Sequence, residues 1–179
     1  MSENEILRLL SKPETQRKGF EMIVRQYSEM LYWKIRNIVQ DHDDANDVLQ
    51  NTFLKAWQGL GEFHSKSKLS TWLYRIAVNE SLDHLRKQKS KVSADEDISV
   101  ANRLLADNFF DGDEAQALLQ EAIAQLPVVQ RTAFTLRYYD NMKYSEMSIL
   151  LKTSEGALKA SYHIAVKKIH DYLLNFSKS

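Results

Sequence analysis

The stretch from residue 63 to residue 91 combines two kinds of side chain that can bind nucleic acid. It holds seven lysines and arginines against only two acids. It also holds side chains that can stack on bases or hydrogen-bond to base edges: His64, Trp72, Tyr74 and Asn79. Cations that follow phosphates, with aromatic faces between them, form the kind of surface that a single nucleic-acid strand needs. The alternative is an amphipathic helix whose basic end is simply solvated.

A helix is expected to carry most of these side chains. Apolar residues recur at steps of three and four, which predicts one buried face: Leu69, Trp72, Leu73, Ile76 and Ala77. Ser70 or Thr71 can cap the start, because a hydroxyl accepts from the free N–H groups of a first turn. Trp72 belongs to the buried stripe as well, so it can be a core residue instead of a base-binding one.

A second, polar stripe runs along the same helix at steps of four, four and three: Arg75, Asn79, Asp83 and Arg86. This stripe can face nucleic acid. The alternative is a set of surface pairs, such as Asp83 with Arg86, each worth roughly a few tenths of a kcal/mol.

The charge of the chain is balanced overall but unevenly distributed. Its 179 residues suffice for one medium or two small domains with a buried core. Lysine plus arginine and aspartate plus glutamate are 24 each, yet the basic stretch is followed at 92–121 by an acidic one. Without cysteine, disulfides and thiolate chemistry are excluded. The chain shows no secretory signal and no run of roughly twenty apolar residues, so we expect a soluble, cytoplasmic protein.

The chain is expected to be all-α, with two small helical domains joined by a flexible linker. Strand-like alternation is absent, and only two prolines and five glycines interrupt the helical patterns. The first domain, 1–90, holds predicted helices at 3–11, about 15–40 and about 43–60, and the helix described above. Pro13 is expected to stop the first of these, and Gly59 and Gly61 the third. Residues 91–112 form the predicted linker, with a short helix at 100–106.

The helix at 43–60 is expected to turn one face to the core: Ala45, Val48, Leu49, Thr52, Phe53, Ala56, Trp57 and Leu60. Acidic residues at its start, Asp43 and Asp44, favour the positive end of the helix dipole, so we assign no metal site to them.

The second domain, 113–179, ends in a helix-turn-helix pattern. Two helices are predicted before it, from Asp113 to about residue 125 and from Val129 to about Tyr139. A short helix at 144–151 and a turn at 152–153 follow, and Ser154 caps a last helix that reaches about residue 176. Such a unit places the start of its second helix in the major groove of DNA. The alternative is an ordinary pair of packed helices.

Four motifs occur in a fixed order along the chain. The first half has D-A-N-D-V-L-Q-N-T-F-L-K-A-W at 44–57 and S-T-W-L-Y-R-I-A-V-N-E-S-L-D-H-L-R-K at 70–87. The second half has L-P-V-V-Q-R-T-A-F-T-L-R-Y-Y-D-N-M-K-Y-S-E-M at 126–147 and S-E-G-A-L-K-A-S-Y-H-I-A at 154–165. Together they resemble the extracytoplasmic-function-type (group 4) sigma factors of bacterial RNA polymerase, in the sigma-70 family.

This resemblance implies two tasks for the first domain, which would be a sigma region 2 domain. The helix at 43–60 would bind a coiled coil of the largest core polymerase subunits, beta and beta-prime, through Asp47, Gln50, Asn51 and Leu54. The loop and helix that follow would capture a flipped base of the minus-ten promoter element through His64, Lys66, Lys68, Trp72, Tyr74, Arg75, Asn79, Arg86 and Lys87. Stacking and hydrogen bonds can offset the roughly few kcal/mol that extracting a base costs.

For the second domain the resemblance implies a sigma region 4 domain that reads the minus-thirty-five element. The residues that match are Ser154, Glu155, Gly156, Ala157, Lys159, Ala160, His163 and Lys167. This chain departs from the common pattern, because Ser161 and Ile164 stand where many members have arginines and Lys152 replaces the usual turn glycine. Tyr162 and Ile164 can therefore be packing residues instead. The acidic linker would thread the RNA exit route of the polymerase.

The resemblance implies promoter DNA and core RNA polymerase as partners, and an anti-sigma factor of a kind that is often membrane-bound. It implies no cofactor, metal or enzymatic activity, and no nucleophile–base pair or phosphate-binding loop stands out in the sequence. Two other classes stay open on the residues alone: a one-component helix-turn-helix transcriptional regulator and an RNA-processing enzyme. A regulator of that kind has no need for the basic, aromatic stretch at 63–91.

Overall fold

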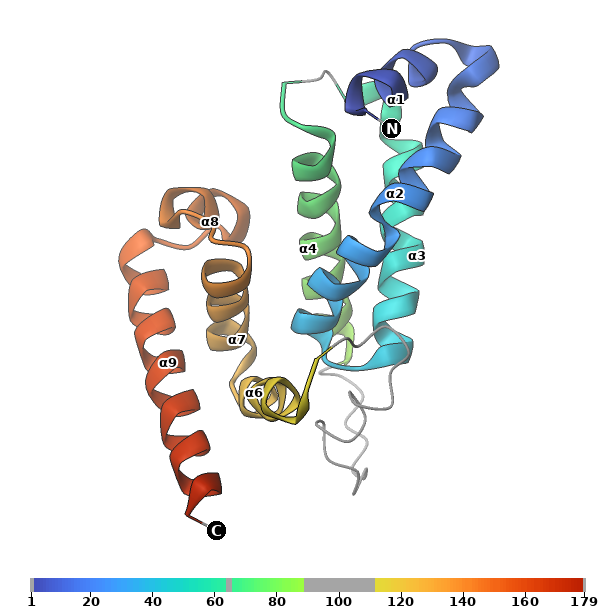
Figure 1. Ribbon diagram of the computed structural model, residues 1–179. Helices are drawn as coiled ribbons and strands as arrows, with labels where there is room; N and C mark the ends of the chain where they lie inside the picture. Colours follow the sequence, from blue (N-terminus) through green and yellow to red (C-terminus); the bar gives the residue numbers. More distant parts are fainter. Residues whose placement is uncertain (1, 64–65, 89–111, 179) are drawn as a thin grey trace. The chain divides into compact units, whose positions relative to one another are not determined.

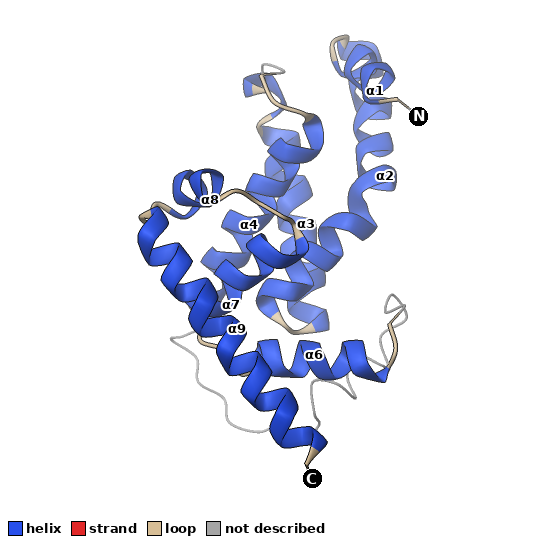
Figure 2. Ribbon diagram, turned by 60° about the vertical axis from the view of Figure 1, so that its left-hand side comes forward, coloured by secondary structure: helices blue, strands red, loops and turns tan. Residues whose placement is uncertain are grey.

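The computed structural model describes residues 2–63, 66–88 and 112–178. All regular structure in these residues is helical, as Figure 2 shows, so the all-α prediction is confirmed. The chain divides into two compact units, residues 1–92 and 93–179. We describe each unit by itself (Figure 1). The predicted linker and its short helix at 100–106 lie outside the described residues, apart from Gly112.

The first unit consists of four α-helices and one short 3-10 helix: α1 (Glu3–Leu10), α2 (Pro13–Val39), α3 (His42–Gln58), η1 (Leu60–Glu62) and α4 (Leu69–Gln88). A capping box begins α1, because Ser2 and Glu5 each bond the other's backbone N–H. Pro13 occupies the first position of α2, where a missing N–H costs nothing. Pro13 therefore starts a helix as well as following one.

The residues that close α2 and α3 differ in backbone conformation, and the sequence did not indicate this difference. Gly59 closes α3 with a φ of −90°, so it does not use the left-handed conformation that favours glycine. Gln40 closes α2 with a φ of 70°. Its side chain donates to the carbonyl of Asn37 at 2.7 Å, which offsets part of the strain of that conformation.

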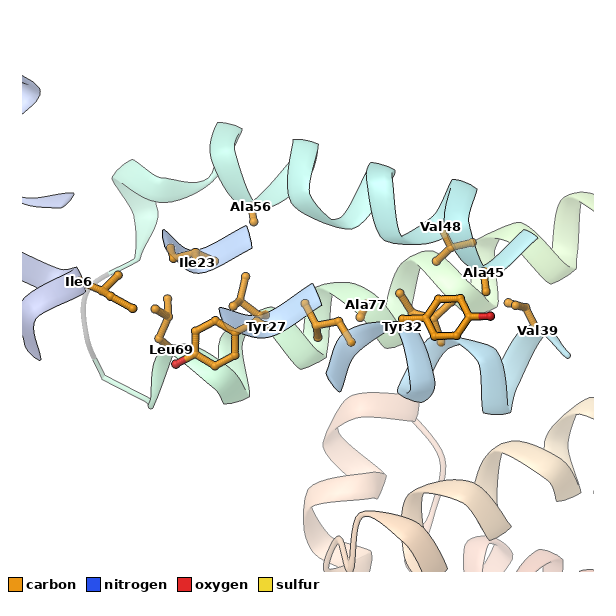
Figure 3. Packing of buried hydrophobic residues seen from close by; sticks show 13 residues of the cluster. Ile6, Ile23, Tyr27, Tyr32, Val39, Ala45, Val48, Ala56, Leu69 and Ala77 are labelled. Atoms are coloured by element: carbon orange, nitrogen blue, oxygen red, sulfur yellow. The ribbon is translucent and has the colours of Figure 1, made fainter. Parts of the chain in front are cut away.

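One core cluster holds the first unit together, with contributions from all four α-helices. Figure 3 shows Ile6, Ile23 and Leu69 at one end of the cluster and Val39, Ala45 and Val48 at the other. α2 packs against α1, α3 and α4, and α3 packs against α4. Because α4 touches both α2 and α3, it buries two adjacent rows: Leu69, Leu73 and Ala77, and Tyr74, Val78 and Ser81.

The second unit consists of α6 (Glu114–Ala124), α7 (Val128–Phe134), η2 (Thr135–Tyr139), α8 (Tyr144–Leu151) and α9 (Glu155–Ser177). Asp113 caps α6 by accepting from the N–H of Gln116 at 2.9 Å. The single helix predicted up to Tyr139 is instead an α-helix continued by a wider π-helical turn, η2. The core lies between α6, α7 and α9: Ala122, Ile123, Leu126, Phe134, Ala165 and Ile169.

None of the helices in the described residues is both long and apolar enough to cross a membrane.

Candidate nucleic-acid interface

The start of α4 is fixed by a residue that is distant in sequence but lies beside it in the first unit. The N–H of Leu69 donates to Oε1 of Glu3 in α1 at 2.8 Å. Ser70 and Thr71 lie inside the helix, and neither caps it. The predicted hydroxyl cap is therefore wrong, because a carboxylate distant in sequence satisfies the first donor of the helix.

Four of the residues predicted to meet the minus-ten element are exposed around the first turns of α4. These are Lys66, Lys68, Arg75 and Asn79. The lysine and arginine cations and the Asn79 amide are exposed to solvent, so they can reach phosphates and base edges. His64 lies outside the described residues.

The two aromatic rings predicted beside these cations are packed against protein. The ring of Trp72 is partly buried, contacts the core cluster and lies 4.9 Å from the ring of Phe63. Tyr74 is 7% exposed, and Nζ of Lys34 lies 4.2 Å from its ring centroid. Tyr74 therefore has no open face for a base in this structure, and we correct its assignment to a core residue. Trp72 is partly exposed and packs against the core with the rest of its surface.

The C-terminal end of α4 is basic, but one of its cations pairs with an acid on the same helix. Nη1 of Arg86 lies 2.7 Å from Oδ1 of Asp83, which is the surface pair expected at this spacing. Lys87 is exposed beside it. Arg86 is also exposed, so this pair can exchange Asp83 for a phosphate at little cost.

α3 presents a polar face that does not pack on the core. Asp47, Gln50 and Asn51 are exposed, and the side chain of Leu54 is 55% exposed. Trp57 was expected on the inner face, but it is 41% exposed, and the centroid of its ring lies 5.0 Å from that of Phe20. Leu54 and Trp57 are three residues apart on the helix, so their exposed apolar surfaces are neighbours.

The helix-turn-helix prediction is confirmed in the second unit. Ser154 Oγ accepts from the N–H of Ala157 at 3.2 Å and caps α9. The turn closes through Lys152, whose φ is 52°, and the N–H of Thr153 donates to the carbonyl of Ser148 at 3.3 Å. The position where glycine is usual thus takes the left-handed conformation although it holds a lysine.

α9 exposes all the residues predicted to meet the minus-thirty-five element: Ser154, Glu155, Gly156, Ala157, Lys159, Ala160, His163 and Lys167. Leu158 and Ala165 face the opposite way and are buried. The ring of Tyr162 stacks on that of Phe134, with centroids 5.9 Å apart and an interplanar angle of 14°. Tyr162 is therefore a packing residue, whereas Ile164 is 46% exposed and is not.

Both units match known protein families. The model of "Sigma-70 region 2" matches residues 23–91, and that of "Sigma-70, region 4" matches residues 116–169. The "ECF RNA polymerase sigma factor SigM" of Mycobacterium tuberculosis is 32% identical over 146 residues, which cover 80% of this chain and 71% of SigM. The "RNA polymerase sigma-H factor" of Pseudomonas aeruginosa is 29% identical over 160 residues, covering 80% of each protein.

The chain belongs to the extracytoplasmic-function sigma factors of the sigma-70 family. Its fold agrees with this assignment. The sigma factor RpoE of Bartonella quintana, solved with the anti-sigma factor NepR, superposes with a TM-score of 0.66 at 21% sequence identity, over 87% of this chain and 97% of that one. The protein is thus a transcription initiation factor that directs RNA polymerase to promoters.

Polar contacts join α3 to α4 in this sigma factor. Lys55 on α3 pairs with Glu80 on α4, and this hydrogen bond raises the pKa of Lys55. At the other end of the pair of helices, Asp44 accepts from Nε2 of Gln88 at 2.6 Å. Nε2 of His84 lies 3.1 Å from the same carboxylate. Asp44 on α3 thus contacts two residues of α4, Gln88 and His84.

The sequence did not indicate an aromatic stack that packs against α9. The ring of Tyr138 lies parallel to that of Phe134, with centroids 5.0 Å apart, and Phe134 in turn stacks on Tyr162. Next to it, desolvation raises the pKa of Tyr139 to about 12, and its hydroxyl accepts from Gln120. The π-helical turn η2 carries both tyrosines. No sequence pattern marks such a turn, so only the repeated aromatics could have suggested the stack.

Proposed function

We propose that this sigma factor binds core RNA polymerase through the exposed face of α3 and reads promoters with two further surfaces. The observation that carries the proposal is that α3 leaves Asp47, Gln50, Asn51 and the apolar Leu54 in solvent, on the side away from its buried residues Ala45, Val48, Thr52 and Ala56. The beta and beta-prime subunits of the polymerase would cover this face. The chain then acts in the cytoplasm as a specificity subunit with no reaction of its own.

The second surface lies at the start of α4 and takes the separated strand of the minus-ten element. Lys66, Lys68 and Arg75 contact its phosphates, and Asn79 reads a base edge. With Tyr74 packed in the core, the partly exposed Trp72 supplies the aromatic contact. Arg86 and Lys87 extend the basic surface along the helix.

The third surface is the exposed face of α9, which enters the major groove at the minus-thirty-five element. Gly156, Ala157 and Ala160 let the helix approach closely, and Lys159 and Lys167 contact phosphates. Phosphate contacts make binding strongly salt-dependent and carry little sequence information. Lys159→Ala should therefore weaken binding to promoter and scrambled duplexes equally. A loss confined to the promoter duplex would instead assign base readout to Lys159.

Run-off transcription with purified core polymerase on genomic fragments tests the function as a whole. The double substitution Asp47→Ala/Gln50→Ala should lower the affinity for core polymerase and leave helicity unchanged. Glu29→Ala/Gln26→Ala, on exposed positions of α2, is a control matched in charge and amide loss. Equal core binding by both double variants would disprove the polymerase face. Specific transcriptional control without any binding to core polymerase would favour a one-component regulator.

Base capture and duplex melting can be separated on a promoter with a pre-melted bubble at the minus-ten element. We expect capture to dominate, because stacking and a base-edge hydrogen bond are worth about as much as unstacking one base costs, roughly 1–3 kcal/mol. Asn79→Ala should therefore impair transcription from the intact promoter and from the bubble. Full rescue by the bubble would show that this surface acts in melting.

We also infer an anti-sigma partner for this chain. The supporting observation is the shared fold with a sigma factor solved with the anti-sigma factor NepR. A membrane-bound partner would place the signal outside the cytoplasm. Affinity purification of the tagged protein from membranes and from the soluble fraction tests both points.

A further inference from the structure

Helix α1 lies beside both ends of the segment that joins α3 to α4. At the exit of this segment, Glu3 accepts from the N–H of Leu69. At its entry, Leu7 and Leu10 of α1 line a shallow pocket together with Leu60 and Phe63. Figure 1 shows α1 at the same end of the first unit as the start of α4. The helix therefore hydrogen-bonds one end of the segment that carries Lys66 and Lys68 and shares a pocket with the other end.

α1 is itself held firmly in the first unit. Ile6 is 0% exposed and belongs to the same core cluster as Leu69, which is also 0% exposed. On α2, a Cβ added at Gly19 would lie 3.0 Å from Cβ of Leu9, so glycine permits the close approach of the two helices. With its backbone anchored in this way, α1 presents Glu3 to Leu69 from a fixed position.

The contact between Glu3 and Leu69 fixes the residues that carry the cations. Lys68 immediately precedes Leu69, and its carbonyl accepts from the N–H of Trp72 at 3.1 Å. The Leu69 N–H bond and this first helical bond together set the backbone of Lys68, and Lys66 lies only two residues before it. Phosphate contacts fix the register of a strand against the groups that read its bases. A change at Leu69 therefore shifts that register.

We infer that Glu3 is a positioning residue for the minus-ten surface: through Leu69, its carboxylate sets where Lys66 and Lys68 meet the separated strand. This inference rests on the proposed function of that surface. The family model for region 2 matches residues 23–91, so α1 and Glu3 lie outside the matched residues, whereas Leu69 lies inside them. Glu3 itself touches no base and brings a negative charge near the phosphates.

The charge and the hydrogen bond of Glu3 have opposite effects on binding, and two substitutions separate them. In Glu3→Gln the amide oxygen still accepts from Leu69, while the charge that repels phosphates is lost. This variant should keep its discrimination between bases and bind strands equally or more tightly at low salt. In Glu3→Ala the donor of Leu69 loses its partner, and discrimination should fall by about fivefold or more.

The measurement uses the full-length protein bound to core polymerase. Fluorescently labelled single strands carry the minus-ten element, either matched or with one base changed, and the ratio of their dissociation constants gives the discrimination. Val48→Ala is the control for stability, because it removes buried volume at the opposite end of the same core cluster (Figure 3). It should lower the thermal midpoint at least as much as Glu3→Ala and leave the discrimination ratio unchanged.

The outcomes separate this inference from the proposed function. Lys66→Ala/Lys68→Ala must weaken strand binding; if it does not, the proposed minus-ten surface is wrong. If it does, and Glu3→Ala keeps its discrimination ratio within about twofold of the wild type, less than one hydrogen bond to a charged group is worth, only the inference on Glu3 is overturned. An equal loss of discrimination in Val48→Ala and Glu3→Ala also overturns it, because the effect then follows stability alone.

Discussion

The two helices proposed to meet DNA begin in different ways. The first N–H of α4 is satisfied by Glu3, a residue 66 positions away in the sequence. The first turn of α9 is satisfied by Ser154, the residue directly before it. The start of α4 therefore exists only when the first unit has folded, whereas the start of α9 is encoded locally. One surface depends on the tertiary structure and the other on a cap and a turn.

The two helices also differ in how much of their surface is buried. α4 lies against two other helices and buries both Leu73 and Tyr74, which are adjacent in sequence. α9 buries a narrow row that includes Leu158 and Ala165 and leaves small and basic residues in solvent. A change in the core of the first unit should thus reach its DNA-binding surface more readily than a comparable change in the second unit.

The largest effect is expected for the buried first residue of α4. Leu69→Ala should lower the free energy of unfolding of the first unit by about 2–5 kcal/mol, because it leaves a cavity in the core beside Ile6 while keeping the backbone N–H that donates to Glu3. Hydrogen exchange of the α4 amides measures this loss. Leu54→Ala, at an exposed position, should change it by less than about 0.5 kcal/mol. Unaltered exchange in Leu69→Ala would mean that α4 does not depend on this anchor.

A smaller effect is expected from the local cap of α9. Ser154→Ala should lower the free energy of unfolding of the second unit by about 1 kcal/mol, because the N–H of Ala157 loses its acceptor. Ser70→Ala and Thr71→Ala, the same change in the first turn of α4, should cost less than about 0.5 kcal/mol each. Hydrogen exchange in the first turns of the two helices measures both. A cost at Ser70 equal to that at Ser154 would remove the difference between the helices.

The smallest effect is expected at the left-handed residues that close α8 and α2. Lys152→Gly should raise the free energy of unfolding of the second unit by up to about 1 kcal/mol, because glycine adopts a positive φ without steric strain. Gln40→Gly should gain less, since it also removes the hydrogen bond from the Gln40 side chain to Asn37. Denaturant unfolding of the two variants measures both changes. A larger gain at Gln40 would show that its side chain contributes nothing to the cap.

The same division explains what the sequence could predict. The helix-turn-helix follows from neighbouring residues, so its cap at Ser154 and its limits were predicted within a residue or two. The start of α4 was mispredicted because its acceptor, Glu3, lies on another helix. Hydroxyls inside the first turn gave a false local signal.

The sequence pattern predicted the buried residues of one row of α4 but not those of the second row. The periodic pattern of α4 identified Leu69, Leu73 and Ala77. It could not identify Tyr74, because the pattern does not tell that two helices pack on α4 from adjacent sides. On α3 the pattern predicted that Trp57 is buried, but its side chain is exposed.

The position of Trp72 against Phe63 has a practical consequence for spectroscopy. All three tryptophans of the chain, Trp33, Trp57 and Trp72, lie in the first unit. Tryptophan fluorescence, excited selectively over that of tyrosine, therefore reports on that unit alone, without any label. A strand bound beside Trp72 should change this emission, whereas a duplex bound only by α9 should leave it unaltered, so the two halves of promoter recognition can be followed separately in one cuvette.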